Sequence, residues 1–223
     1  MLRNRTKKRH TLAKLLFGLG LILIAAGLIT RKFNSYNQTI SQSNKSIANL
    51  SKKIASTTAK STNKSVMRTP IDWQKSSQTT AYPDLKSTSD LWILVKLRAN
   101  RTYLKSGSKT IYTMYSSGGK YRQKNGQTVS YTPIGTYYVQ NERGKTFYNA
   151  SLNEGANYWV SFLNHGEYLF HTVPIDSQGN YKKDEAAKLG KEPASHGCIR
   201  LSIPDAKYLY ENLPVNTRVV IQN

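Results

Sequence analysis

The chain has 223 residues, of which 33 are Lys or Arg and 12 are Asp or Glu, so its formal net charge is +21. This length suits one catalytic-size domain with additional segments. The charge favours anionic partners, such as nucleic acid, an anionic membrane surface or an acidic cell-wall polymer. We expect no nucleic acid, because the basic residues neither cluster on one helix nor alternate with an aromatic reading face. A solvated basic surface with no specific partner is the remaining alternative.

The amino terminus has the pattern of a membrane anchor. Five basic residues among the first nine precede an uncharged apolar run over residues 15–30. As a helix this run spans about 24 Å, and residues 11–14 extend it to the ~30 Å of a hydrocarbon core. A cleaved signal peptide is the alternative, but basic residues rather than a small-residue cleavage site follow the run. We expect a cytoplasmic basic tail and a single transmembrane helix over 1–32, with the remaining chain extracellular, facing the cell wall.

Residues 33–90 are rich in Ser, Thr, Asn, Gln and Lys, a composition that buries too little apolar surface to fold alone. We therefore expect a flexible polar spacer. A helical stalk with weak self-association through 33–54 is the alternative, because apolar residues there follow a heptad register: Phe33, Tyr36, Ile40, Ile47, Leu50 and Ile54.

The pattern changes at Leu91, and residues 91–223 are predicted to form one compact β-rich domain. A helix is predicted to begin at the Ser202 cap and to end at Pro214. Several short strands with one or two short helices indicate a β-sandwich or barrel-like domain. Aromatic and β-branched runs predict strands at 91–97, 109–115, 135–139, 158–163, 168–173 and 217–222.

Cys198 is the only cysteine, which excludes an intrachain disulfide and a zinc site made of several cysteines. A catalytic cysteine needs a base or a positive field nearby. His171, at the end of an apolar strand, is the first candidate base, and His196 is the second. Gly197 would let backbone amides approach an oxyanion. Arg200 would lower the thiol pKa, bind a substrate carboxylate or pair with an acid.

Two alternatives stay open when only these residues are considered. The cysteine could be a small buried apolar group, or it could hold zinc together with His171 and His196. His165 is interpreted as a surface residue, because it lies with Gly166 in a predicted turn between two strands.

The segment Ser195-His196-Gly197-Cys198-Ile199-Arg200-Leu201 resembles the signature of the L,D-transpeptidase (YkuD-type) catalytic domain family. The segment Thr132-Pro133-Ile134-Gly135-Thr136-Tyr137 is similar to the family's Thr-Pro-x-Gly-Thr-aromatic segment. His171 lies upstream of the cysteine, as the family's catalytic histidine does. The resemblance covers 91–222 and implies the family's β-rich, sandwich-like fold.

The resemblance implies acyl transfer on peptidoglycan stem peptides, and hence a role in cell-wall organisation and cell shape. Cys198 would be the nucleophile that forms a thioester and releases the terminal D-Ala, and His171 would be the general acid and base. Ser195, His196, Gly197 and Arg200 would support the oxyanion and the substrate. An amine acceptor gives transpeptidation and water gives carboxypeptidation. Neither a metal nor a cofactor is implied.

The stretch between His171 and Ser195, residues 172–194, is longer than usual in the family and predicts an inserted loop or lid near the site. Arg200 stands where many members have Asn. A non-catalytic wall-binding module and a metal-dependent amidase are the rival functions.

Overall fold

The computed structural model describes residues 31–51 and 66–223, and the chain divides into two compact units, Met1–Asn63 and Lys64–Asn223. Within the first unit, residues 31–51 are helical. Residues 52–54 of the alternative helical stalk, with its heptad residue Ile54, lie outside the described residues, so the stalk stays a prediction. The apolar heptad residues of this helix are exposed, and self-association through them stays a prediction. The predicted transmembrane run at 15–30 lies outside the described residues. Within the described ranges, no helix is long and apolar enough to cross a membrane.

The second unit begins well before the predicted boundary at Leu91. Leu85 is only 2% exposed and belongs to the main apolar core. The Ser77 hydroxyl donates to Asp205 Oδ2 at 2.5 Å, and the Tyr82 hydroxyl donates to Asp205 Oδ1 at 2.7 Å. The prediction of a flexible spacer is therefore wrong for residues 66–90. A polar segment needs no core of its own when a few of its side chains pack into an existing core or hydrogen-bond to it.

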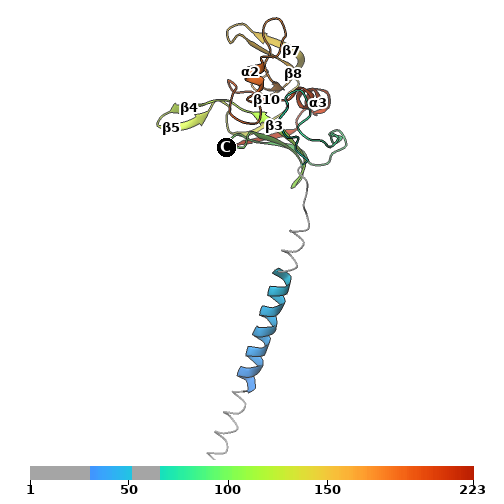
Figure 1. Cartoon of the computed structure of the whole chain (residues 1–223), viewed down its shortest axis with the longest axis vertical. Coiled ribbons are helices and arrows are strands. Elements are labelled where there is room, and N and C mark those ends of the chain that lie inside the picture. Colours follow the sequence, from blue (N-terminus) through green and yellow to red (C-terminus); the bar gives the residue numbers. More distant parts are fainter. Residues whose placement is uncertain (1–30, 52–65) are drawn as a thin grey trace, which may run out of the picture. The chain divides into compact units, whose positions relative to one another are not determined.

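Nine strands form one sheet in the order β6-β11-β1-β2-β3-β10-β9-β8-β7, and β4 and β5 form a separate two-stranded hairpin (Figure 1). The prediction of a mainly β domain is confirmed. The strands are β1 (Leu91–Lys96), β2 (Arg101–Ser106), β3 (Lys109–Ser117), β4 (Tyr121–Lys124), β5 (Gln127–Ser130), β6 (Gly135–Tyr138), β7 (Arg143–Asn149), β8 (Glu154–Leu163), β9 (Tyr168–Thr172), β10 (Ile199–Leu201) and β11 (Arg218–Gln222).

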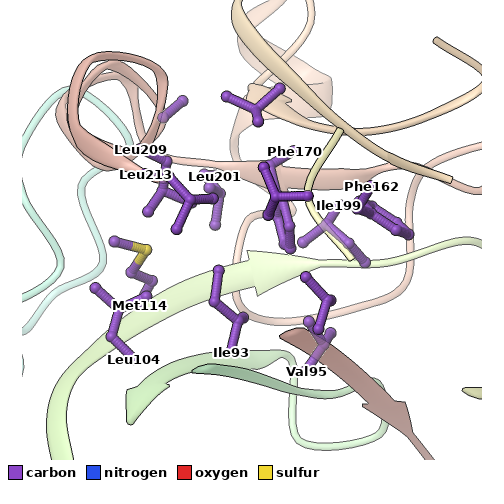
Figure 2. Close-up of a cluster of buried hydrophobic side chains, with 14 of the residues drawn as sticks. Ile93, Val95, Leu104, Met114, Phe162, Phe170, Ile199, Leu201, Leu209 and Leu213 are labelled. Carbon is purple, nitrogen blue, oxygen red and sulfur yellow. The ribbon is translucent and has the colours of Figure 1, made fainter. Parts of the chain in front are cut away.

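The sheet has two halves that meet at β3, which pairs with β2 along one edge and with β10 along the other. The main core contains buried side chains from both halves. Figure 2 shows Ile93, Leu104 and Met114 facing Phe170 and Leu209 across the core. Each of these five side chains is fully buried, which contributes roughly 1.5–3 kcal/mol per side chain. The sheet thus curls around its own core, in agreement with the barrel-like expectation.

The helix α3 (Ile203–Asn212) completes the core and begins as predicted. Its cap is Ser202, whose hydroxyl accepts a hydrogen bond from the Asp205 amide at 3.3 Å. A second short helix, α2 (Lys183–Ala186), lies within the 172–194 stretch. The domain therefore has the expected one or two short helices.

Candidate active site

A cavity of about 510 Å³ opens beside β8, β9 and the segment before β10. Its volume falls within the range of small-molecule sites. Five of the six predicted site residues line it, namely His171, Ser195, His196, Cys198 and Arg200. The remaining lining residues are Phe147, Asn149, Leu152, Glu154, Gly155, Trp159, Gly166, Glu167, Tyr168, Leu169 and Pro174.

The pairing of β9 with β10 brings His171 and Cys198 to one face of the sheet. The strands are parallel, with Phe170 opposite Ile199 and His171 opposite Arg200. Phe170 and Ile199 are fully buried in the core. Because side chains alternate between the two faces of a strand, His171 and Arg200 project from the opposite face. Cys198, directly before Ile199, lines the same cavity.

The segment around Cys198 is held by its own hydrogen bonds. The Ser195 hydroxyl donates to the Cys198 carbonyl at 2.5 Å and accepts from the Gly197 amide at 3.0 Å. The Ser195 amide donates to the Gly118 carbonyl at 3.0 Å. Ser195 thus fixes the turn that presents the thiol. The Gly197 amide, expected to face an oxyanion, is already engaged with Ser195.

Gly197 adopts a φ of +143°, which side chains of L residues rarely adopt. A Cβ atom at this position would lie 2.8 Å from a ring carbon of Tyr168 and 3.2 Å from the Tyr131 carbonyl oxygen. The Thr132 hydroxyl donates to the Gly197 carbonyl at 2.7 Å and accepts from the Gly119 amide at 2.8 Å. Thr132, from the segment that resembles the family's Thr-Pro-x-Gly-Thr-aromatic pattern, therefore fixes the backbone directly before Cys198.

His171 is 6% exposed, and its Nδ1 atom lies 2.6 Å from the Thr172 carbonyl oxygen. A carbonyl only accepts, so Nδ1 carries the proton and Nε2 keeps a free lone pair. The Phe147 ring contacts the imidazole edge-on at 5.8 Å. Burial, and then the Arg200 charge, lower the pKa of His171 to about 4. The imidazole is thus neutral near pH 7.

The Cys198 thiol donates to the Glu167 carbonyl at 3.5 Å. Burial raises the pKa of this thiol to about 11, although an amide hydrogen bond from Leu169 and the Arg200 charge act in the opposite direction. The expected lowering by Arg200 is therefore present but is outweighed by desolvation. The resting pair is a neutral thiol and a neutral imidazole.

Arg200 is 2% exposed and pairs with two carboxylates. Its Nη2 lies 2.8 Å from Glu154 Oε2, and its Nη1 lies 2.7 Å from Glu185 Oε2. Of the three roles expected for Arg200, pairing with an acid is the one that these contacts match. Burial raises the pKa of Glu185, but hydrogen bonds from Lys188 and Arg200 outweigh this and lower it to about 2.

The pair with Glu185 attaches the 172–194 stretch to the sheet, because Glu185 lies on α2 and Arg200 lies on β10. The pair with Glu154 joins the beginning of β8 to the same arginine. Val173, Ala186 and Leu189 of the same stretch form a second buried apolar cluster with Tyr115. The stretch is therefore packed against the domain beside the site, and its being an insertion relative to the family stays a prediction. Sequence reasoning missed Glu154 and Glu185 as site residues, because distant carboxylates carry no local motif.

The two other histidines of the domain lie nearer the surface. The His196 side chain is 52% exposed, and its Nδ1 lies 3.9 Å from Glu154 Oε2. The His165 side chain is 75% exposed and pairs with Glu142, which confirms that it is a surface residue. Across residues 31–51 and 66–223, no group of three or more His, Cys, Asp or Glu side chains could hold a metal ion. The alternative zinc site of His171, His196 and Cys198 is thus not formed.

A buried histidine with a fixed tautomer and a cysteine that share one cavity form the kind of site used in nucleophilic catalysis. The family model of the YkuD L,D-transpeptidase catalytic domain matches residues 90–221. The chain is also 49% identical over 158 residues to the protein named "Putative L,D-transpeptidase YciB" of Bacillus subtilis (strain 168), which covers 71% of this chain and 78% of that protein. The chain belongs to the YkuD L,D-transpeptidase family.

Solved structures to which parts of the chain are similar include an L,D-transpeptidase from Mycobacterium smegmatis, with 18% identity and a TM-score of 0.46. That match covers 60% of this chain and 59% of that one. Another is a "Fused Zn-dependent amidase/peptidase/peptodoglycan-binding domain-containing protein" from Clostridium acetobutylicum ATCC 824, with 28% identity and a TM-score of 0.42. There the match covers 60% of this chain and 52% of that one. The chain thus spans little more than half of either structure.

Proposed function

We propose that this protein is a cysteine-dependent acyltransferase that acts on peptidoglycan stem peptides. The observation that carries the proposal is that His171 on β9 and Cys198, directly before the parallel strand β10, line one cavity. Membership of the L,D-transpeptidase family supports the substrate class.

In the acylation step, Cys198 Sγ attacks the carbonyl carbon that links the third stem residue to the terminal D-Ala. His171 Nε2 takes the thiol proton as the C–S bond forms, because neither group is charged at rest. Since the Gly197 amide is engaged with Ser195, we assign oxyanion stabilisation to the Cys198 amide. The C–N bond then breaks, and the leaving D-Ala amine receives the proton from His171.

In the second step, an amine of another stem attacks the thioester and loses its proton to His171. The tetrahedral intermediate collapses, and the proton returns to the Cys198 thiolate as it leaves. This sequence is transpeptidation. Water in place of the amine gives the carboxypeptidase alternative, and the same residues serve both reactions.

The acceptor is tested by incubating the purified full chain with tetrapeptide muropeptides and identifying the products by mass. Transpeptidation predicts cross-linked dimers, whereas tripeptides without dimers would indicate carboxypeptidase action. Recovery of unchanged tetrapeptides from a folded protein would contradict both. The control is His165→Gln, a histidine outside the cavity, which should give the wild-type products.

We further propose that the chain is held in the cell membrane by residues 15–30, with the catalytic domain outside. The apolar run and the basic residues before it support this. The test is alkaline carbonate extraction of membranes from cells that express either the full chain or a chain beginning at residue 31. Only the full chain should stay in the pellet, and its release by carbonate would contradict an integral anchor.

A further inference from the structure

One half of the sheet and the β4–β5 hairpin are rich in basic residues. Between Asp90 and Glu142 the sequence has no Asp or Glu but eight Lys or Arg residues. These residues span β1, β2, β3 and the β4–β5 hairpin. In the described part of the chain, no ion pair involves any of the eight or Arg218 on β11. Their charges are therefore not neutralised by protein carboxylates.

Four side chains of this half lie in one row across neighbouring strands. Tyr138 pairs with Arg218, Arg218 with Trp92, and Trp92 with Lys105. The row thus alternates aromatic and basic residues over β6, β11, β1 and β2. The expectation that basic and aromatic residues do not alternate is wrong for this face, because the alternation runs across strands and not along the sequence.

This row points away from the core. One chain neighbour of each position is buried, namely Val139, Val219, Ile93 and Leu104. Alternation of side chains therefore places the row on the outer face. Tyr138 is 55% exposed, Arg218 is exposed, and Trp92 and Lys105 are partly exposed.

The aromatic and basic groups are arranged around Trp92. The Arg218 guanidinium lies 4.7 Å from the Trp92 ring centroid, and Lys105 Nζ lies 5.8 Å from it. The Trp92 Nε1 group donates to the Gly107 carbonyl at 2.8 Å, which fixes the indole. Both cations lie over the indole ring, so Trp92 positions their charges. The exposed Tyr138 ring is then free to stack against a sugar ring while the two cations bind its anionic substituents.

The spacing of the row fits a repeating ligand. Neighbouring strands lie about 4.8 Å apart, so like groups recur roughly every 10 Å across the sheet. That period is comparable with the length of a disaccharide. A linear polysaccharide with one anionic group per disaccharide would match both the aromatic and the basic positions.

We propose that this outer face, defined by Tyr138, Arg218, Trp92 and Lys105, binds an anionic polysaccharide strand. The choice of a polysaccharide over another polyanion rests on the proposed function, which assigns the chain to the cell wall. The face would hold the domain on an anionic wall polysaccharide while the separate cavity acts on stem peptides.

Binding is measured by calorimetry on the purified full chain, with hyaluronan octasaccharide as the anionic probe and chitin oligosaccharides as the uncharged probe. The double variant Lys105→Gln, Arg218→Gln should weaken hyaluronan binding roughly five- to tenfold, because two exposed ionic contacts are lost. Tyr138→Ala should weaken it by a smaller factor, about threefold, through loss of stacking. Unchanged affinity in both variants would overturn the proposal.

A matched control removes the same charge elsewhere. Lys75 and Lys207 are exposed and pair with Asp72 and Glu211, so the double variant Lys75→Gln, Lys207→Gln should bind hyaluronan as the wild type does. An equal loss of affinity in this control would show a dependence on net charge alone and would overturn the assignment to the face.

Two further probes test which class of ligand the face binds. A single-stranded DNA oligonucleotide and phosphatidylglycerol vesicles should bind more weakly than hyaluronan and should respond little to the face variants. Tighter binding of either probe, lost in Lys105→Gln, Arg218→Gln, would overturn the polysaccharide assignment. Carbapenem labelling of Cys198 in the same samples reports on the proposed function separately, because the face lies outside the cavity and its variants should label normally.

Discussion

At the scale of single residues, the site depends on two groups that are uncharged at rest. Burial keeps the Cys198 thiol protonated and the His171 imidazole neutral. The hydrogen bond from Nδ1 to the Thr172 carbonyl leaves Nε2 as the basic atom. Such a site avoids the cost of a permanent ion pair in a buried setting, and the base forms its charge only during reaction.

The lowered pKa of His171 predicts an unusual pH dependence. Only the neutral imidazole accepts a proton, and the folded-state pKa of about 4 lies below the ordinary 6.5. Acylation of Cys198 by a carbapenem should therefore stay constant from pH 7 to about pH 5 and fall as pH decreases through about 4. Rapid-quench mass spectrometry of the full chain measures this rate. A midpoint near pH 6.5 would contradict the assignment.

Gly197 should tolerate no side chain. In Gly197→Ala the new Cβ atom meets Tyr168 and the φ of +143° becomes strained, which costs about 1–3 kcal/mol in the free energy of unfolding. Relief of that strain would displace Cys198, so the acylation rate should fall by about 100-fold, as misplacement of a catalytic group does.

The matched control for this variant is Gly126→Ala in the β4–β5 turn, where φ is +74° and no atom lies within 4 Å of the added Cβ. Gly126→Ala should have a lower free energy of unfolding, but its Cys198 should be acylated at the wild-type rate. If Cys198 were acylated at the same rate in Gly197→Ala as in Gly126→Ala, the close contact between residue 197 and Tyr168 would have no catalytic importance.

At the scale of elements, Arg200 links the 172–194 stretch to the sheet through Glu185 and also pairs with Glu154 of β8. Arg200→Met should leave both carboxylates without their buried partner and lower the free energy of unfolding by about 3–5 kcal/mol. Chemical denaturation measures this loss, and hydrogen exchange should increase across 172–194. Lys207→Met, which removes a surface pair with Glu211, should cost less than about 1 kcal/mol. Equal effects of the two variants would contradict the role of Arg200.

The sequence predicted the elements whose pattern is local. The strand at 91–97, the α3 cap at Ser202 and the turn at His165 were all visible as short runs or turn residues. The sequence did not predict β2 or β7, because their exposed basic and polar residues hide the alternation. The Glu154–Arg200–Glu185 contacts were also missed, since residues far apart in the chain meet only after the sheet forms.

At the scale of the whole molecule, the compact unit needs residues that its composition assigned to a spacer. Leu85 is in the core, and Ser77 and Tyr82 donate to the buried Asp205 carboxylate on α3. We predict that a fragment 64–223 folds cooperatively. A fragment 91–223 should be less stable by at least about 3 kcal/mol, because the buried Asp205 carboxyl loses its bonds from Ser77 and Tyr82 and a cavity remains at Leu85. Urea denaturation followed by circular dichroism compares them. Equal midpoints would show that 66–90 is dispensable.

We propose above that Cys198 is the nucleophile and that His171 is its base. The most direct test is intact-mass analysis of the full chain after exposure to a carbapenem. We predict one covalent adduct, which is absent in Cys198→Ala, forms at least about 100-fold more slowly in His171→Gln and forms normally in His165→Gln. An adduct that persists in Cys198→Ala, or a wild-type rate in His171→Gln, would contradict the claim.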